Sequence, residues 1–205
     1  DCSSLTGKLT LPESVTAISD YAFYNTRFTE VEIPEAVTEI ESGTFKKCTA
    51  LTKVTFNEGL EYIWSYAFDG CTNLENVSLP STLKTISSYA FRNCSAFTNI
   101  NVSSGTIGSS AFSGCSNVTN VSVASGTIGN YAFFGCTGLK TVTMAEGLET
   151  IGTYAFENCT SLVEFNVPSR VAEVGNNTFA GCTSLKSITL PNGLIFLADK
   201  MFQGC

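Results

Sequence analysis

A Phe-x-x-Cys motif recurs along this sequence at nearly constant spacing, as in SYAFDGC (65–71) and TYAFENC (153–159). The phenylalanines at this slot run from Phe23 to Phe202 and are separated by 21 to 23 residues. A fixed period of this size indicates a repeat architecture, in which each unit buries its apolar side only by stacking on its copies. We therefore expect residues 1–205 to form one array of about nine coils of about 23 residues.

Within each unit the pattern predicts a short strand, a breaker, a second extended piece and a corner. Val54 and Phe56 alternate with polar residues, which is typical of a strand, and a proline ends the corresponding run in several units. The corner Tyr-Ala-Phe-x-x-Cys is expected to be a tight helical or 3₁₀ turn. Before the cysteine slot stands Gly or Asn, which enter the left-handed region at low cost, and only Lys47 departs.

The repeated phenylalanines and cysteines are expected to face the interior as structural residues. They are, in the central units, Phe68, Phe91, Phe112, Phe133, Phe156, Cys71, Cys94, Cys115, Cys136 and Cys159. The nine cysteines favour a column of buried thiols over a disulfide frame or metal sites. An odd number cannot pair fully, no Cys-x-x-Cys exists, and one thiol per coil forms no tetrahedral cluster. We predict no metal and no cofactor.

Composition argues against several classes of function. The chain has no histidine, which removes the commonest general base and the Ser-His and Cys-His dyads, so we predict that it is not an enzyme. The net charge is −7 and no basic stripe is present, which argues against nucleic-acid binding. No apolar run approaches the ~18 residues of a membrane helix, so membrane insertion is not expected.

The unit CTNLENVSLPSTLKTISSYAFRNC (71–94) resembles the BspA-like, or Treponema-type, leucine-rich repeat, and this resemblance extends over the whole chain. It implies a right-handed, β-rich solenoid of the β/α type, with a parallel sheet on the concave face and short extended or 3₁₀ turns on the convex face. It also implies an extracellular or cell-surface location, adhesion to host or microbial proteins, and no catalytic residues. The units that close at Cys115 and Cys136 lack two residues, which should change the local curvature.

The exposed strand positions form the first candidate binding surface, in two columns. The first contains Lys53, Asn76, Asn99, Asn120 and Thr141, and the second Thr55, Ser78, Asn101, Ser122 and Thr143. Residues 93–139 carry no charge, so the middle of this face is neutral and rich in amides and hydroxyls. It is either a platform for a protein or a glycan, or a set of ladders whose side chains hydrogen-bond one another.

The convex side supplies a second candidate, formed by Tyr62, Trp64, Tyr66 and Tyr89. Tyr and Trp are favoured anchors at interfaces, although a tyrosine stack that shields the coil edge explains the same pattern. A third candidate is an acidic group that meets a basic partner or weakly holds Ca²⁺, or that is simply solvated: Glu30, Glu32, Glu35, Glu39 and Glu41.

These patterns predict a non-enzymatic binding module, and the resemblance implies that it is secreted or on a cell surface and binds an extracellular host or microbial protein. The alternatives are a spacer that projects another domain and a glycan-binding platform. The chain ends at Cys205 in phase with the repeat, so we expect the array to be part of a longer one or its last coil to be covered.

Overall fold

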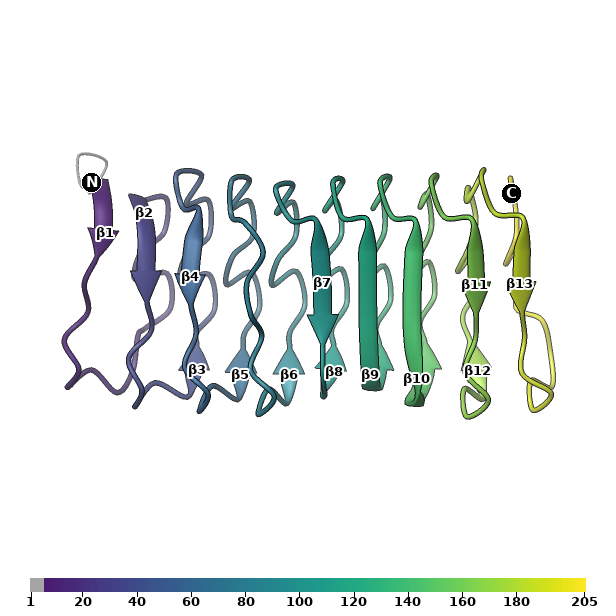
Figure 1. The fold of residues 1–205 in the computed structure, drawn as a ribbon, viewed down its shortest axis with the longest axis horizontal. Coiled ribbons are helices and arrows are strands. Elements are labelled where there is room, and N and C mark those ends of the chain that lie inside the picture. The colour runs from purple at the N-terminus through teal and green to yellow at the C-terminus, as the bar shows by residue number, and fades with distance from the viewer. Residues whose placement is uncertain (1–5) are drawn as a thin grey trace.

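Parallel strands from successive coils lie side by side along one axis in the computed structural model, which describes residues 6–205 (Figure 1). The strand face contains β1 (Thr6–Leu9), β2 (Arg27–Glu32), β4 (Lys53–Thr55), β7 (Asn99–Val102), β9 (Asn120–Ile128), β10 (Thr141–Ile151), β11 (Glu164–Asn166) and β13 (Ser187–Thr189). A second ladder behind it contains β3 (Glu39–Ile40), β5 (Tyr62–Ile63), β6 (Thr85–Ile86), β8 (Thr106–Ile107) and β12 (Glu173–Val174). Strands β9 and β10 are long enough to join both ladders. The predicted solenoid of stacked parallel coils is thus confirmed.

No helix forms anywhere in residues 6–205, so this part of the chain contains no helix that could cross a membrane. Each corner is a chain of turns in which Ala67, Asp69 and Cys71 donate their backbone N–H to the carbonyl three residues earlier. The intervening Tyr66, Phe68 and Gly70 donate instead to carbonyls of the next coil. The corner is therefore a series of tight turns and not a continuous helix, because Tyr66 (φ 60°) and Gly70 (φ 78°) have left-handed backbones that prevent continuation.

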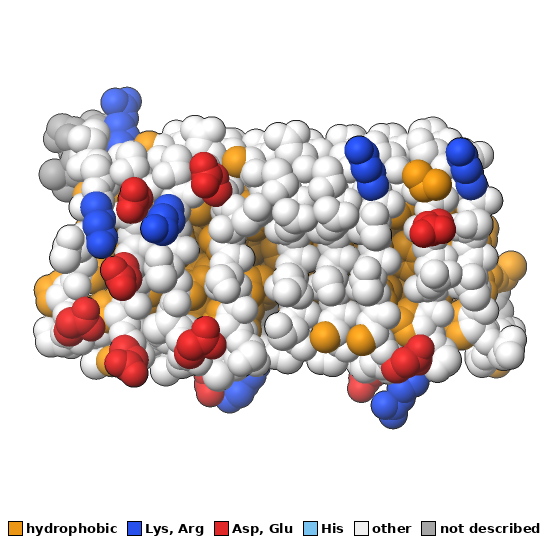
Figure 2. Space-filling model, viewed as in Figure 1, with side chains coloured by type: hydrophobic (Ala, Val, Ile, Leu, Met, Phe, Trp, Pro, Cys, Tyr) orange, Lys and Arg blue, Asp and Glu red, His pale blue; other side chains and the backbone are white. Residues whose placement is uncertain are grey.

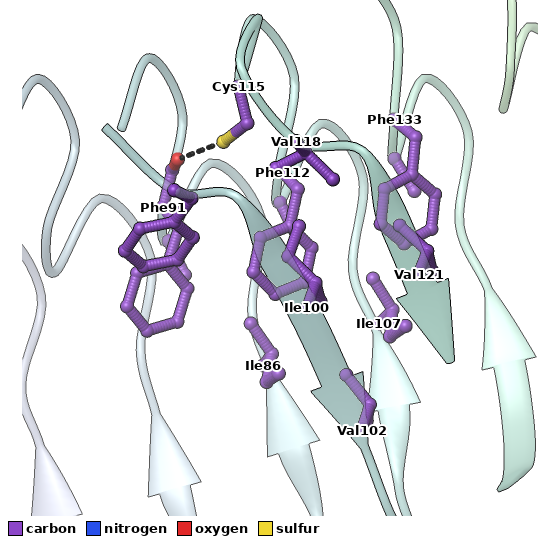
Figure 3. Packing of buried hydrophobic residues seen from close by; sticks show 14 of the residues in the cluster. Ile86, Phe91, Ile100, Val102, Ile107, Phe112, Cys115, Val118, Val121 and Phe133 are labelled. Atoms are coloured by element: carbon purple, nitrogen blue, oxygen red, sulfur yellow. Dashed lines mark hydrogen bonds between the residues drawn. The ribbon is translucent and has the colours of Figure 1, made fainter. Parts of the chain in front are cut away.

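The core is organised around one column of phenylalanine rings. Successive repeat phenylalanines from Phe23 to Phe202 stack with centroids 5.1–6.0 Å apart and planes within 2–16° of parallel. Figure 3 shows Phe91, Phe112 and Phe133 in this arrangement, with Ile86, Ile100 and Val121 filling the space around them. The offset, parallel packing of aromatic rings suits a structure whose coils repeat by translation.

The cysteines lie beside this column and each donates a weak hydrogen bond across coils. Cys115 Sγ donates to the carbonyl oxygen of Phe91 at 3.3 Å (Figure 3), and the same carbonyl accepts the N–H of Cys94 at 3.2 Å. Every described cysteine from Cys48 to Cys205 makes the equivalent thiol bond, at 2.9–3.4 Å. The thiol therefore fills space and also satisfies the second lone pair of a carbonyl, which an alanine does not do. Cys2 lies outside the described residues.

The two shortened units are accommodated by glycines. Gly105 (φ 91°) and Gly126 (φ 95°) turn the chain where the longer units carry two additional residues. A Cβ on Gly126 would overlap the carbonyl oxygen of Gly105. Where a full-length unit follows a short one, two register shifts in β10, at Met144/Gly147 and Leu148/Thr150, absorb the length difference as bulges.

One expected strand is absent. Residues 76–79 follow the repeat pattern but lie between β4 and β7 without forming a ladder. In their place the amide oxygen of Asn76 accepts the backbone N–H of Thr98 and of Asn99, at 2.9 and 3.0 Å. A side chain here takes over bonds that would otherwise go to a carbonyl, so the coils remain connected although the strand pairing is lost.

Candidate binding surfaces

The strand face carries both predicted columns, except that Asn76 and Ser78 lie in a segment that forms no strand. Asn99 pairs with Asn120, and Asn120 with Thr141, while Asn101 pairs with Ser122, and Ser122 with Thr143. Parallel pairing places neighbours in a column about 4.8 Å apart. Charged side chains gather toward the ends of this face and leave its middle uncharged (Figure 2).

In the first column the side chains hydrogen-bond one another. Asn120 donates to the amide oxygen of Asn99 at 2.9 Å and to Thr119 Oγ1 at 2.9 Å. Asn99 and Asn76 both donate to Thr98 Oγ1, at 3.0 and 2.8 Å. From the sequence the column is interpreted either as a platform for a ligand or as a ladder of side chains that hydrogen-bond one another. At Asn76, Asn99 and Asn120 the side chains form the ladder.

The second column differs, because its side chains make no hydrogen bond to another described residue. Thr55, Ser78, Asn101 and Thr143 are exposed and Ser122 is half-buried. Their hydroxyl and amide groups are directed out of a backbone that is fixed by the sheet and by the neighbouring ladder. The donors and acceptors of this column are consequently available to a ligand.

The convex aromatic residues form two separate stacks. Tyr62 and Trp64 lie parallel with centroids 5.4 Å apart, and the indole N–H of Trp64 donates to the carboxylate of Glu39 at 2.7 Å. Tyr66 and Tyr89 stack at 4.8 Å on neighbouring corners. Trp64, which no other unit matches, thus stacks on Tyr62 of its own coil and hydrogen-bonds Glu39 of the preceding coil, while Tyr66 and Tyr89 belong to the corner edge.

Sequence reasoning missed the charged residues around the second stack. Asp69, whose side chain is 5% exposed, accepts two hydrogen bonds from Arg92, at 2.8 and 3.0 Å, and lies 3.6 Å from Lys46 Nζ. Lys46 Nζ is 4.4 Å from the centroid of Tyr66, and Arg92 Cζ is 4.9 Å from that of Tyr89. Lys46, Asp69 and Arg92 occupy one slot in three consecutive units, and their alternating charge was the signal in the sequence.

The five glutamates do not gather into one group. Glu30 and Glu32 lie in β2, whereas Glu39 lies in β3 on the second ladder. Glu32 pairs with Lys8 at 3.4 Å, and burial together with the charges of Glu39 and Asp20 raises the pKa of Glu41. Within residues 6–205 no three His, Cys, Asp or Glu side chains are placed to hold a metal ion. The idea of a weak Ca²⁺ site therefore has no support.

The buried thiols are expected to be unreactive, because burial disfavours their thiolate form. Burial raises the pKa of Cys136 and of Cys182 to about 12, and it raises the pKa of Cys94 and Cys115 well above the ordinary value of 9.0. Only a thiolate is a good nucleophile or metal ligand, and these groups remain protonated at neutral pH.

These features define a leucine-rich-repeat scaffold: a closed stack of parallel coils with an exposed polar strand face. A model of the BspA type leucine rich repeat region matches the chain in six copies, over residues 1–119 and 105–205. The chain therefore belongs to the BspA-type leucine-rich repeat family, whose repeats generally serve as protein-interaction modules. No curated protein sequence matches the chain.

Solved structures of bacterial leucine-rich repeat proteins share this fold. One from Bacteroides ovatus is 29% identical with a TM-score of 0.60, and the match covers 95% of this chain and 63% of that one. The chain thus spans less than two thirds of the length of that protein. A Treponema pallidum leucine-rich repeat protein is 24% identical with a TM-score of 0.68, over 76% of this chain and 77% of that one. One from Eubacterium ventriosum is 19% identical with a TM-score of 0.52, over 87% and 70%.

Proposed function

We propose that this array is a non-enzymatic adhesion module, secreted or displayed on a cell surface, that docks a host or microbial protein on its strand face. The observation that carries the proposal is the second column, Asn101, Ser122 and Thr143 with their neighbours. It presents unpaired polar groups on a surface that the sheet and the Asn ladder hold rigid. A rigid surface loses little conformational entropy on binding, which favours affinity.

The absence of charge in the centre of this face suits a neutral polar partner surface. Interfaces of this kind are stabilised by complementary shape and hydrogen bonds. A charge that is buried there without a partner makes binding less favourable. Membership of a family of protein-interaction modules and the quiet buried thiols both support a binding role rather than catalysis.

The test adds charge to the second column. The variant Asn101→Lys/Ser122→Lys should lower the affinity for purified matrix or microbial surface proteins at least tenfold in surface plasmon resonance, because two lysines would be buried unpaired. The control Ser184→Lys/Asn192→Lys adds the same charge at exposed positions off this column and should bind normally.

Each other outcome opposes the proposal in a distinct way. Equal binding by both variants would place the interface elsewhere. If the unmodified chain binds no protein in the panel, the spacer interpretation is favoured, and if it binds only an array of oligosaccharides, the module is a glycan platform.

A further inference from the structure

Four consecutive corner turns bring three cations and four tyrosines together at one edge of this acidic molecule. A surface hollow there is lined by Tyr21, Tyr24, Lys46, Lys47, Asp69 and Arg92. Three of the chain's 11 basic residues line it against a single acid, whereas the whole chain carries −7. The hollow is therefore locally positive, and it lies on a different part of the coil from the strand face.

The cations are held in place from within. The nearly buried carboxylate of Asp69 fixes the guanidinium of Arg92 through two hydrogen bonds and also pairs with Lys46. The tyrosine rings support them from the sides, since Lys46 Nζ lies 4.4 Å from Tyr66 and Lys47 Nζ lies 5.9 Å from Tyr24. A guanidinium has five N–H donors, and the two used by Asp69 leave the others free. Because these side chains are already held in place, they lose little conformational entropy when an anion binds.

Lys47 supplies the third cation of the hollow. It occupies the slot before the cysteine position, where the other units have Gly or Asn, and it nevertheless adopts the same left-handed conformation, with φ 61°. A lysine pays a conformational cost in this region that Asn and Gly largely avoid. Lys47 is exposed and makes no salt bridge to another described residue, so its charge is available to an anion.

We propose that this hollow binds a single carboxylate, carried by an acidic side chain in an otherwise uncharged, aromatic-containing segment of a partner protein. Lys46, Lys47 and Arg92 contact the carboxylate, and the exposed rings of Tyr21 and Tyr24 pack against the apolar groups beside it. A long polyanion fits less well, because Asp20 and Glu41 line an adjoining hollow and repel it.

A titration followed by NMR tests the ligand chemistry. The capped peptide Ac-Gly-Phe-Glu-Phe-Gly-NH₂ should shift the amide signals of Tyr24, Lys47 and Arg92 and lose affinity as salt is raised. Its twin with Gln in place of Glu should cause no comparable shifts. Equal shifts by both peptides would overturn the proposal, and so would binding of a sulfated oligosaccharide in the absence of peptide binding.

Two matched substitutions separate binding from stability. Lys47→Asn removes the cation and relieves the backbone, so it should weaken the Glu peptide roughly fivefold while raising Tm by about 2 °C. Lys200→Asn relieves a similar left-handed lysine (φ 53°) outside the hollow and should leave peptide binding unchanged. Unchanged binding by Lys47→Asn would refute the site. The strand-face variant Asn101→Lys/Ser122→Lys should bind the peptide normally, so this inference and the proposed function can fail separately.

Discussion

A phenylalanine in the middle of the array touches its equivalents on both sides. Phe112 is fully buried, with ring centroids 5.4 Å from Phe91 and 5.5 Å from Phe133. Because both neighbours are fixed by their own coils, the space left by a missing ring cannot easily collapse.

We therefore expect Phe112→Ala to lower the free energy of unfolding by about 3–5 kcal/mol. Urea denaturation followed by circular dichroism measures this change. Phe196→Ala serves as the control, because that ring is 56% exposed and its loss should cost less than about 1 kcal/mol. Similar losses in the two variants would contradict the account of the stack.

At this scale the sequence indicates which residues repeat but not how each one is satisfied. The inward-facing positions can be identified because apolar residues recur at the same place in successive repeats, which is not expected by chance. The bond from Cys115 to the Phe91 carbonyl depends on how adjacent coils are aligned, which no single unit encodes. The partner of Trp64 was invisible for the same reason, since Glu39 lies 25 residues away in another coil.

The elements of the coil follow the repeat less closely than its residues do. The two-residue deletion was readable from the sequence, but the way the fold absorbs it was not: glycines at Gly105 and Gly126, then bulges in β10. Residues 76–79 have strand-like alternation yet form no ladder, because Asn76 bonds to the next coil through its side chain. Local pattern therefore predicts the coil, and contacts between neighbouring coils decide which segments pair.

A glycine substitution tests the shortened corner. Gly126→Ala should destabilise the protein by several kcal/mol, about 3 or more, because its φ of 95° suits only glycine and the new Cβ would meet the Gly105 carbonyl. Gly193→Ala is the control, since apart from Gly193 and its two chain neighbours no residue has an atom within 4 Å of the position that the new methyl group would take. Thermal unfolding compares the two, and a Gly126→Ala protein as stable as Gly193→Ala would show that the corner adapts.

Over the whole molecule the surfaces divide by chemistry. The strand face is neutral in its centre, the second ladder carries Glu39 and Trp64, and the corner edge of the first coils is positive. The period alone predicted the register of the columns across β7, β9 and β10, although Asn76 and Ser78 lie in no strand, whereas the positive hollow arises only where four coils meet. A repeat scaffold fixes the backbone of every coil and leaves these variable positions to determine partners.

The column of thiols gives the whole array a characteristic response to alkali. The pKa of Cys136 is raised from 9.0 to about 12 by burial, and the other buried thiols shift in the same direction. Between these two pH values the Cys136 thiol is ionised in the unfolded chain but protonated in the folded chain. Its contribution to stability is therefore complete below pH 9 and is lost as the pH rises toward 12. In this window the Cys136 thiol lowers the free energy of unfolding by up to about 1.4 kcal/mol per pH unit.

We expect urea midpoints to fall steeply between pH 9 and 12, and less steeply in the variant Cys94→Ala/Cys115→Ala/Cys136→Ala, which lacks three of the thiols. Each protein is compared with its own midpoint at pH 7, because the alanines also remove packing and weak hydrogen bonds. The remaining ionisable groups are common to both proteins, so the difference in slope isolates the cysteines. Parallel pH profiles would mean that the thiols ionise within the folded stack, and the buried column would then be more open to water than its full burial implies.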